Sequence, residues 1–256
     1  MDAWAFTLDG TGNLHVAQYY DSAILKYSPS GELLGRWYIV VDGDTLDAGG
    51  LTYVKQHFVA LAWSRVIVLD ENYTAVRSWP ERHPRDFVTG GDLIDADAAG
   101  NIYVLDNNYD RVDVYGFDGS FRTEWHVEAP DTLGQGRLSG IAVTDAGVAY
   151  VADFLGNRIL MYSSDGKLLR TLGVPGSKPG ELNWPSGLDI AGSVLYVADM
   201  SNIRVQKFTL YGSYLSNFYS LGSYGQDIDV PRSVAVYRNH VFVMHGKSII
   251  RYDYSD

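Results

Sequence analysis

A segment of about 46 residues recurs along the whole of this 256-residue chain, and no other feature limits the fold as strongly. The copies at 100–121 (GNIYVLDNNYDRVDVYGFDGSF) and 147–168 (GVAYVADFLGNRILMYSSDGKL) align without a gap. Further copies begin at residues 12 and 192, and weaker ones at residues 56 and 239. Each copy carries one marker valine, and successive markers are 43 to 47 residues apart: Val16, Val59, Val104, Val151, Val197 and Val243. Six units therefore fill the chain.

Each unit alternates apolar and polar residues over short runs and has no helical period, which predicts four short β-strands. In the third unit we expect an inner strand at residues 94–96, a second strand around the marker valine, a third ending at Tyr115 and a fourth ending at Trp125. Four strands in each of six units predict an all-β fold, a six-bladed β-propeller of four-stranded antiparallel blades. We expect a single domain over residues 1–256, with blades at approximately 3–40, 49–80, 91–126, 138–173, 185–219 and 231–254.

The sixth unit is too short for a complete blade. Only four residues follow Tyr252, which is not enough for a turn and a fourth strand, and only three residues precede the first expected strand. We therefore expect the last blade to lack its outer strand, and an exposed strand edge invites pairing with another chain. Either this chain is a domain of a longer protein, or a partner supplies the strand. The alternative is that the first blade is assigned in the wrong register.

Residues 150–191 (YVADFLGNRILMYSSDGKLLRTLGVPGSKPGELNWPSGLDIA) resemble the NHL-repeat family of β-propellers. The third, fourth and fifth units also carry that family's Asp and Arg five residues apart: Asp106/Arg111, Asp153/Arg158 and Asp199/Arg204. In the first unit, Gln18 and Ala23 replace this pair. Because the pair recurs in consecutive units, we interpret it as a brace within the blade rather than a recognition site. The resemblance implies a scaffold that binds proteins, nucleic acids or small ligands, and related six-bladed propellers include hydrolases and lyases.

Charge and composition narrow the range of partners. The formal net charge is −11, without a local cluster of Lys and Arg, which argues against nucleic-acid binding. No uninterrupted apolar run reaches the length of a membrane span, so we expect no membrane insertion. The chain has no cysteine, which excludes disulfides and thiol chemistry. Acidity together with abundant Tyr and Gly favours an extracellular or cell-surface protein over a cytoplasmic one.

The turns between the second and third strands carry large apolar residues where polar ones would be expected. In a propeller these turns and the connectors between blades open on one face, here called the turn-bearing face. Exposed aromatic clusters are typical of partner sites. We therefore predict a binding surface for a protein, a peptide or a small ligand, formed by Tyr19, Tyr20, Trp63, Tyr109, Phe154 and Met200. The alternative is that these residues fold back under the neighbouring connectors.

Two sets of acidic residues are candidate metal sites, and Ca²⁺ or another divalent cation is the cofactor that they would hold. Asp95 and Asp189 have the same inner-strand position in the third and fifth units, which predicts that both line the central channel. Facing carboxylates could hold a divalent cation or act as an acid/base pair, or they could simply be solvated or hydrogen-bonded. Asp42, Asp44 and Asp47 in the first connector offer the oxygen ligands that Ca²⁺ prefers, or form a solvated acidic loop.

These observations leave three hypotheses for function. The first is a non-catalytic ligand- or protein-binding or sensing domain, part of a larger protein, that uses the turn-bearing face. The second is a metal-assisted hydrolase or lyase that uses the central channel. The third is a purely structural module without a ligand. The fold alone does not choose among them.

Overall fold

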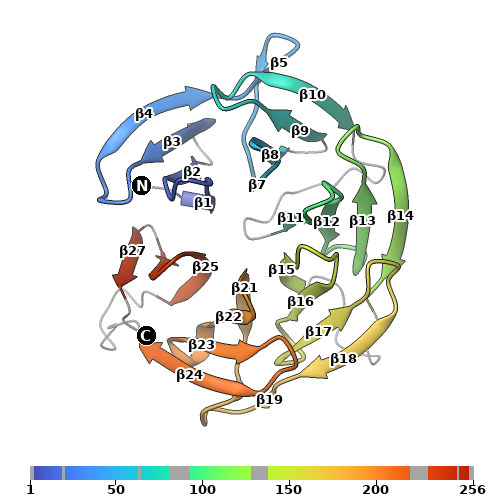
Figure 1. Cartoon of the computed structure of the whole chain (residues 1–256), viewed down its shortest axis with the longest axis vertical. Helices are drawn as coiled ribbons and strands as arrows, with labels where there is room; N and C mark the ends of the chain where they lie inside the picture. Colours follow the sequence, from blue (N-terminus) through green and yellow to red (C-terminus); the bar gives the residue numbers. More distant parts are fainter. Residues whose placement is uncertain are drawn as a thin grey trace.

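The computed structural model describes residues 3–18, 21–62, 65–80, 93–127, 138–219, 230–246 and 248–253. Their main sheets are arranged in a ring around a common centre, as Figure 1 shows, and neighbouring strands within each sheet are antiparallel. The chain is a six-bladed β-propeller. In each blade the strands follow chain order from the centre to the rim. In the described part of the chain, no helix is long and apolar enough to cross a membrane.

The strands of blades 1 to 3 are β1 (Ala3–Leu8), β2 (Leu14–Gln18), β3 (Ala23–Tyr27) and β4 (Leu33–Tyr38); β7 (Gly50–Val54), β8 (His57–Ala62), β9 (Arg65–Leu69) and β10 (Ala75–Pro80); and β11 (Ile94–Ala96), β12 (Ile102–Asp106), β13 (Arg111–Tyr115) and β14 (Phe121–His126). Those of blades 4 to 6 are β15 (Leu138–Val143), β16 (Ala149–Asp153), β17 (Arg158–Tyr162) and β18 (Leu168–Leu172); β21 (Pro185–Ala191), β22 (Val194–Asp199), β23 (Arg204–Thr209) and β24 (Tyr214–Tyr219); and β25 (Pro231–Tyr237), β26 (His240–His245) and β27 (Ser248–Asp253).

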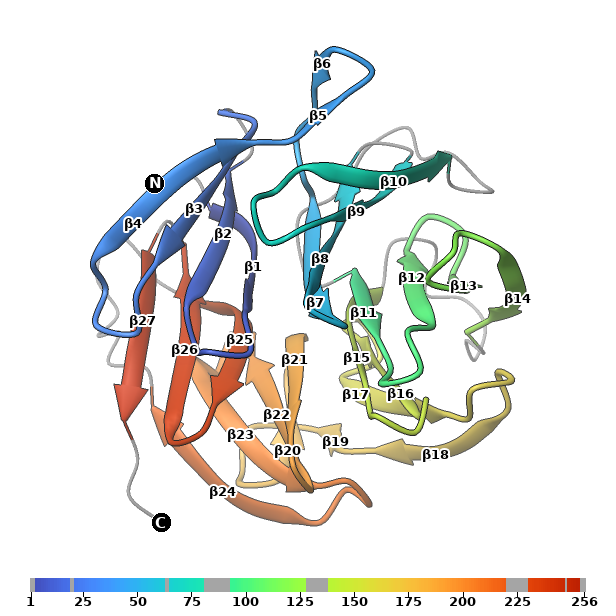
Figure 2. The same cartoon turned by 45° about the horizontal axis from the view of Figure 1, so that its top comes forward.

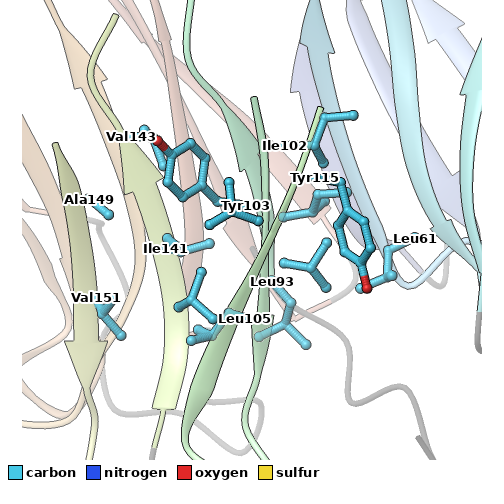
Figure 3. Packing of buried hydrophobic residues seen from close by; sticks show 14 of the residues in the cluster. Leu61, Leu93, Ile102, Tyr103, Leu105, Tyr115, Ile141, Val143, Ala149 and Val151 are labelled. Atoms are coloured by element: carbon cyan, nitrogen blue, oxygen red, sulfur yellow. The ribbon is translucent and has the colours of Figure 1, made fainter. Parts of the chain in front are cut away.

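The second strand of each blade forms the centre of the core, because both of its faces contact a neighbouring blade. All five residues of β12 and of β16 are buried, and the six marker valines lie in β2, β8, β12, β16, β22 and β26. Figure 3 shows this packing between blades, with Tyr103 of β12 beside Val143 of β15. Burial of one such apolar side chain contributes about 1.5–3 kcal/mol. The ring is therefore held together mainly by contacts between blades.

Blade 6 has three strands in the described residues, in the order β25–β26–β27. No fourth strand pairs with β27 in the part of the chain that the structure describes. Blade 1 has all four of its strands in chain order, so the first blade is not shifted in register. The arrangement of these sheets confirms the prediction of an all-β, six-bladed propeller.

The connectors contain short elements that the repeat does not predict. β5 (Val40–Val41) and β6 (Asp44–Thr45) form a small hairpin that projects beyond the ring in Figure 2. β19 (Val174–Pro175) and β20 (Glu181–Leu182) form a short parallel pair in the connector between blades 4 and 5. A 3-10 helix, η1 (Met200–Asn202), forms the turn between β22 and β23.

Candidate functional site

The central channel contains a cavity of about 180 Å³, lined by inner strands of all six blades. Asp95 of β11 and Asp189 of β21 both line it, as their shared register predicts. The other lining residues are mainly apolar: Phe6, Thr7, Leu8, Leu51, Thr52, Tyr53, Ile94, Ile141, Leu188, Val234, Ala235 and Val236. The two carboxylates are therefore the acidic groups that line this cavity.

Asp95 connects three neighbouring blades. Its Oδ1 accepts hydrogen bonds from Thr52 Oγ1 of blade 2 at 2.9 Å and from the backbone N–H of Ala96 at 2.8 Å. Its Oδ2 accepts the backbone N–H of Val143 in blade 4 at 2.7 Å. Burial raises the pKa of Asp95 from 3.8 to about 6, although these three hydrogen bonds lower it. The carboxylate thus joins the inner strands of blades 2, 3 and 4.

Asp189 repeats this arrangement two blades further on. Its Oδ1 accepts the N–H of Ile190 at 2.7 Å, and its Oδ2 accepts the N–H of Val236 in blade 6 at 2.6 Å. Val236 follows the inner-strand position of blade 6 just as Val143 follows that of blade 4. Both aspartates therefore connect their blade to the next one. Among the described residues no group of three His, Cys, Asp or Glu side chains is placed to share a metal ion.

The acidic residues of the first connector point to different partners. Asp42, in the β5–β6 hairpin, lies 3.8 Å from Arg65 Nη1, and its side chain is 79% exposed. Asp47 accepts a hydrogen bond from Ser22 Oγ at 2.6 Å. Asp44 lies on β6 and is exposed. Among the described residues, Asp42, Asp44 and Asp47 are thus not placed to share one metal ion.

Of the six contact residues predicted on the turn-bearing face, the structure describes three: Tyr109, Phe154 and Met200. Tyr19, Tyr20 and Trp63 lie outside the described residues. Tyr109, in the turn between β12 and β13, is 56% exposed. Its ring lies 4.9 Å from the guanidinium carbon of Arg111, a cation–π contact that holds the ring in place.

Phe154, in the turn between β16 and β17, is half-buried under a tryptophan that sequence reasoning did not select. Trp184 lies in the connector between blades 4 and 5 and is 45% exposed. The two rings are stacked, with centroids 5.1 Å apart and an interplanar angle of 27°. Residue 184 therefore extends the predicted aromatic surface from a turn to the neighbouring connector.

The backbone of Trp184 is held in a conformation that costs free energy. Its φ is +57°, in the left-handed region that non-glycine residues rarely occupy. Asn157 Oδ1 accepts its N–H at 2.8 Å, and its carbonyl oxygen accepts the N–H of Met200 at 3.2 Å. Met200, the third described member of the predicted surface, is half-buried and thus supports Trp184 through its main chain.

The connector that carries Trp184 is attached to blade 5 by an Asp/Arg pair. Arg204 Nε donates to Asp199 Oδ2 at 2.8 Å, and its other two nitrogens donate to the carbonyl oxygens of Ser177, Lys178 and Glu181 at 2.8–2.9 Å. Burial raises the pKa of Asp199, against the hydrogen bonds that it accepts. Asp199 Oδ1 also accepts the N–H of Asn183 at 2.7 Å. This explains why so long a connector has a fixed course.

The equivalent pairs in blades 3 and 4 are ion pairs as well. Arg111 Nη2 lies 2.8 Å from Asp106 Oδ2, and Arg158 Nε lies 2.7 Å from Asp153 Oδ2. All three aspartates are buried. The three pairs thus occupy equivalent places within their blades, as the repeat of the motif indicates.

A buried network of hydrogen bonds between blades 1 and 2 was not predicted from the sequence. His15 is fully buried, with Nε2 3.0 Å from Asp9 Oδ2 and Nδ1 2.5 Å from the hydroxyl of Tyr73. Burial lowers the pKa of His15 from 6.5 to about 4, although Asp9 raises it. Burial acts to raise the pKa of Asp9, but its hydrogen bonds with Thr11, Asn13 and His15 hold that pKa well below its usual value. This network connects two blades, and its residues do not line the channel cavity.

No family model matches the sequence. Solved structures of propellers match the fold along almost the whole chain. Virginiamycin B lyase from Staphylococcus aureus has a TM-score of 0.68 at 15% identity, with 100% of this chain and 85% of that one covered. The WD40 β-propeller domain of Doa1 has a TM-score of 0.64 at 13% identity, with 96% and 77% covered. Identities this low show a shared fold and leave function open.

Proposed function

We propose that this chain is a non-catalytic, NHL-type propeller domain that binds a protein or peptide through its turn-bearing face. The observation that carries the proposal is Trp184. An exposed tryptophan occupies a strained backbone conformation, stacks on Phe154, and lies on a connector that a buried ion pair attaches to the ring. Strain that persists at an exposed aromatic residue suggests a role in function rather than in folding.

The physical chemistry of such a surface suits a macromolecular partner. Tryptophan, tyrosine and arginine are the residues that most often dominate binding energy in interfaces, and rings that are already held in place lose little conformational freedom on binding. Tyr109 stacked over Arg111 supplies a second anchor of this kind. The net charge of −11 favours the approach of basic partners.

Selection of random peptides displayed on phage tests this proposal. Wild-type protein should enrich peptides that the variant Phe154→Ser/Trp184→Ser no longer retains. The control is Tyr211→Ser, which removes a tyrosine that is 71% exposed in the turn between β23 and β24, away from the turn-bearing face. This control should retain the same peptides. Failure to enrich any peptide, or equal retention by all three proteins, would contradict the proposal.

A second candidate function is a metal-assisted hydrolase or lyase that uses the channel. Two observations favour it: Asp95 and Asp189 line one cavity, and burial raises the pKa of Asp95 to about 6, within the range useful for proton transfer. Under this candidate, Asp95→Asn would abolish turnover of an ester, lactone or lyase substrate, and Phe154→Ser/Trp184→Ser would leave turnover unchanged.

A further inference from the structure

β27 is an edge strand with no pairing partner strand on its outer side among the described residues. In the other five blades a fourth strand pairs with the third: β4, β10, β14, β18 and β24. Each of these outer strands already closes its own blade. Figure 2 shows β27 at the rim of blade 6, next to blade 1. An edge of this kind is a template for strand addition.

In blades 1 to 4, the fourth strand places one large apolar residue on the next blade. In blade 3, Trp125 pairs opposite Val112, and its ring stacks on Tyr162 of blade 4 with centroids 4.6 Å apart. Trp79 of blade 2 contacts Tyr115 of blade 3 in the same way, with centroids 6.0 Å apart. We call this residue of the outer strand the anchor. The anchors are Trp37, Trp79, Trp125 and Leu172, each opposite the second residue of the third strand, and Phe218 has the same backbone register in blade 5.

Trp79, Trp125 and Leu172 each lie directly over a glycine in the hairpin turn of the next blade, whereas Trp37 packs against Tyr73, which holds that turn position in blade 2. A Cβ built on Gly119, Gly166 or Gly212 would lie 2.9, 2.2 or 2.6 Å from Trp79, Trp125 or Leu172 respectively. These distances are too short for a real Cβ, so the anchor fills the space above each glycine. At these three turns only a residue without a side chain fits.

Gly31 forms the same turn in blade 1, but no described residue fills the space above it. Its N–H donates to the carbonyl oxygen of Ser28 at 2.9 Å, and its φ is +88°, as in the other turns. Apart from its two chain neighbours, no heavy atom of the described residues lies within 4 Å of a Cβ built on it. Blade 6, which precedes it in the ring, has three strands in the described part of the chain. The missing anchor therefore leaves a space at the position that the repeat predicts.

A groove of about 210 Å³ occupies this position between blades 6 and 1. Tyr27 and Gly31 line it from blade 1, at the places where Tyr162 and Gly166 contact Trp125. Ile249 lines it from β27. Ile249 pairs with Met244 as Val112 pairs with Leu105, so it holds the position that faces the anchor. The remaining lining residues are Leu14, Val16, Ser28, Pro29, Ser30, Phe242 and Arg251.

We infer that this groove accepts an extended strand of another polypeptide, paired antiparallel to β27, with a large apolar residue opposite Ile249. Tryptophan fits best, because it is the anchor in blades 1, 2 and 3. The main-chain hydrogen bonds of the ladder would supply affinity, and the anchor pocket would supply specificity. This surface lies at the turn between β3 and β4, away from the turn-bearing face, so the two binding surfaces are independent.

The chain's own outer strands provide the probes. Synthetic peptides with the sequences of residues 31–39, 73–80 and 119–127 each carry one anchor tryptophan, and fluorescence anisotropy measures their binding to the intact protein. At least one should bind, and replacing its tryptophan, as in Trp125→Ser, should weaken binding by about tenfold or more. A copy of the same peptide that is N-methylated on its ladder-forming amides should also lose affinity, because it cannot donate those bonds. These peptide controls leave the folding of the protein unchanged.

A protein variant locates the site. Ile249→Lys places a charge in the groove and should abolish peptide binding, whereas Leu169→Lys makes the same kind of change on β18, the outer strand of a complete blade, where Leu169 is 46% exposed. This control should bind as the wild type does. The inference is overturned if no peptide binds at about 1 mM, if the serine peptide binds as tightly as the tryptophan peptide, or if Ile249→Lys folds and still binds.

Discussion

Arg204 Nε lies 2.8 Å from Asp199 Oδ2, and the same guanidinium donates to three carbonyl oxygens of the connector that carries Trp184. One buried ion pair thus braces blade 5 and fixes a connector on the turn-bearing face. The Asp/Arg spacing in the sequence indicates the first role. The second depends on the course of the connector through space.

Replacing Arg204 should therefore destabilise the folded protein. Arg204→Leu leaves the buried Asp199 carboxylate without its ion partner, which we expect to lower the free energy of unfolding by about 3–5 kcal/mol. Arg36→Leu is the control, because Arg36 and its partner Asp21 are 41% and 57% exposed. Its cost should be below about 1 kcal/mol. Urea unfolding measures the free energy of unfolding of both variants. Similar losses in Arg204→Leu and Arg36→Leu would contradict the stabilising role of the Asp199/Arg204 ion pair.

The buried histidine should give stability a defined pH dependence. The pKa of His15 is about 4 in the folded protein and 6.5 ordinarily, so between these values the unfolded chain binds a proton that the folded chain does not. The contribution is complete above pH 6.5 and is lost as pH falls towards 4. His15→Gln can still donate to Asp9 and accept from Tyr73. From pH 8 to pH 5, the wild type should lose about 2 kcal/mol more than this variant. Parallel pH profiles from urea unfolding would contradict this.

Asp95 should change the pH dependence of stability in the direction opposite to that of His15. Its folded-state pKa of about 6 lies above the ordinary 3.8, so the folded protein binds a proton that the unfolded chain does not, and stability is gained as pH falls through 6. NMR of the side-chain carboxyl carbons measures this titration directly, with Asp95→Asn identifying the signal. We expect a midpoint near 6. A midpoint near 3.8 would show that the channel solvates this carboxylate as fully as water does.

Two glycines with the same backbone conformation test the empty anchor position. Gly166 has φ +82° and lies under Trp125, whereas Gly31 has φ +88° and no described side chain above it. Gly31→Ala should cost only the strain of the left-handed conformation, about 1 kcal/mol. Gly166→Ala adds the displacement of Trp125, typically a further 1–3 kcal/mol. Thermal unfolding separates them, and equal losses would mean that the space above Gly31 is filled.

Much of the fold was predictable because each blade repeats the same local pattern. The marker valines lie in the second strands, and the expected inner strands at Ile94–Ala96 and its equivalents all form. In blade 6 the described residues form an inner, a second and a third strand at the places that the repeat predicts. These features depend on alternation and spacing, which a sequence contains in full.

The site was less predictable, because it depends on how different units meet. Trp184 is conspicuous only once its contacts with Phe154 and Asn157 are known. The hydrogen bond from Val143 to Asp95 joins residues 48 positions apart. Tyr73 occupies the turn position that glycine holds in blades 1, 3, 4 and 5, and this local signal could have revealed its special role.

The most direct test of the account is isothermal titration of one phage-selected peptide into three proteins: the wild type, Phe154→Ser/Trp184→Ser and Asp95→Asn. If the turn-bearing face is the binding surface, the double variant should lose at least about 2 kcal/mol of binding free energy, and Asp95→Asn should bind as the wild type does. The reverse result, with binding lost in Asp95→Asn and retained in the double variant, would assign the binding site to the channel and contradict the proposed function.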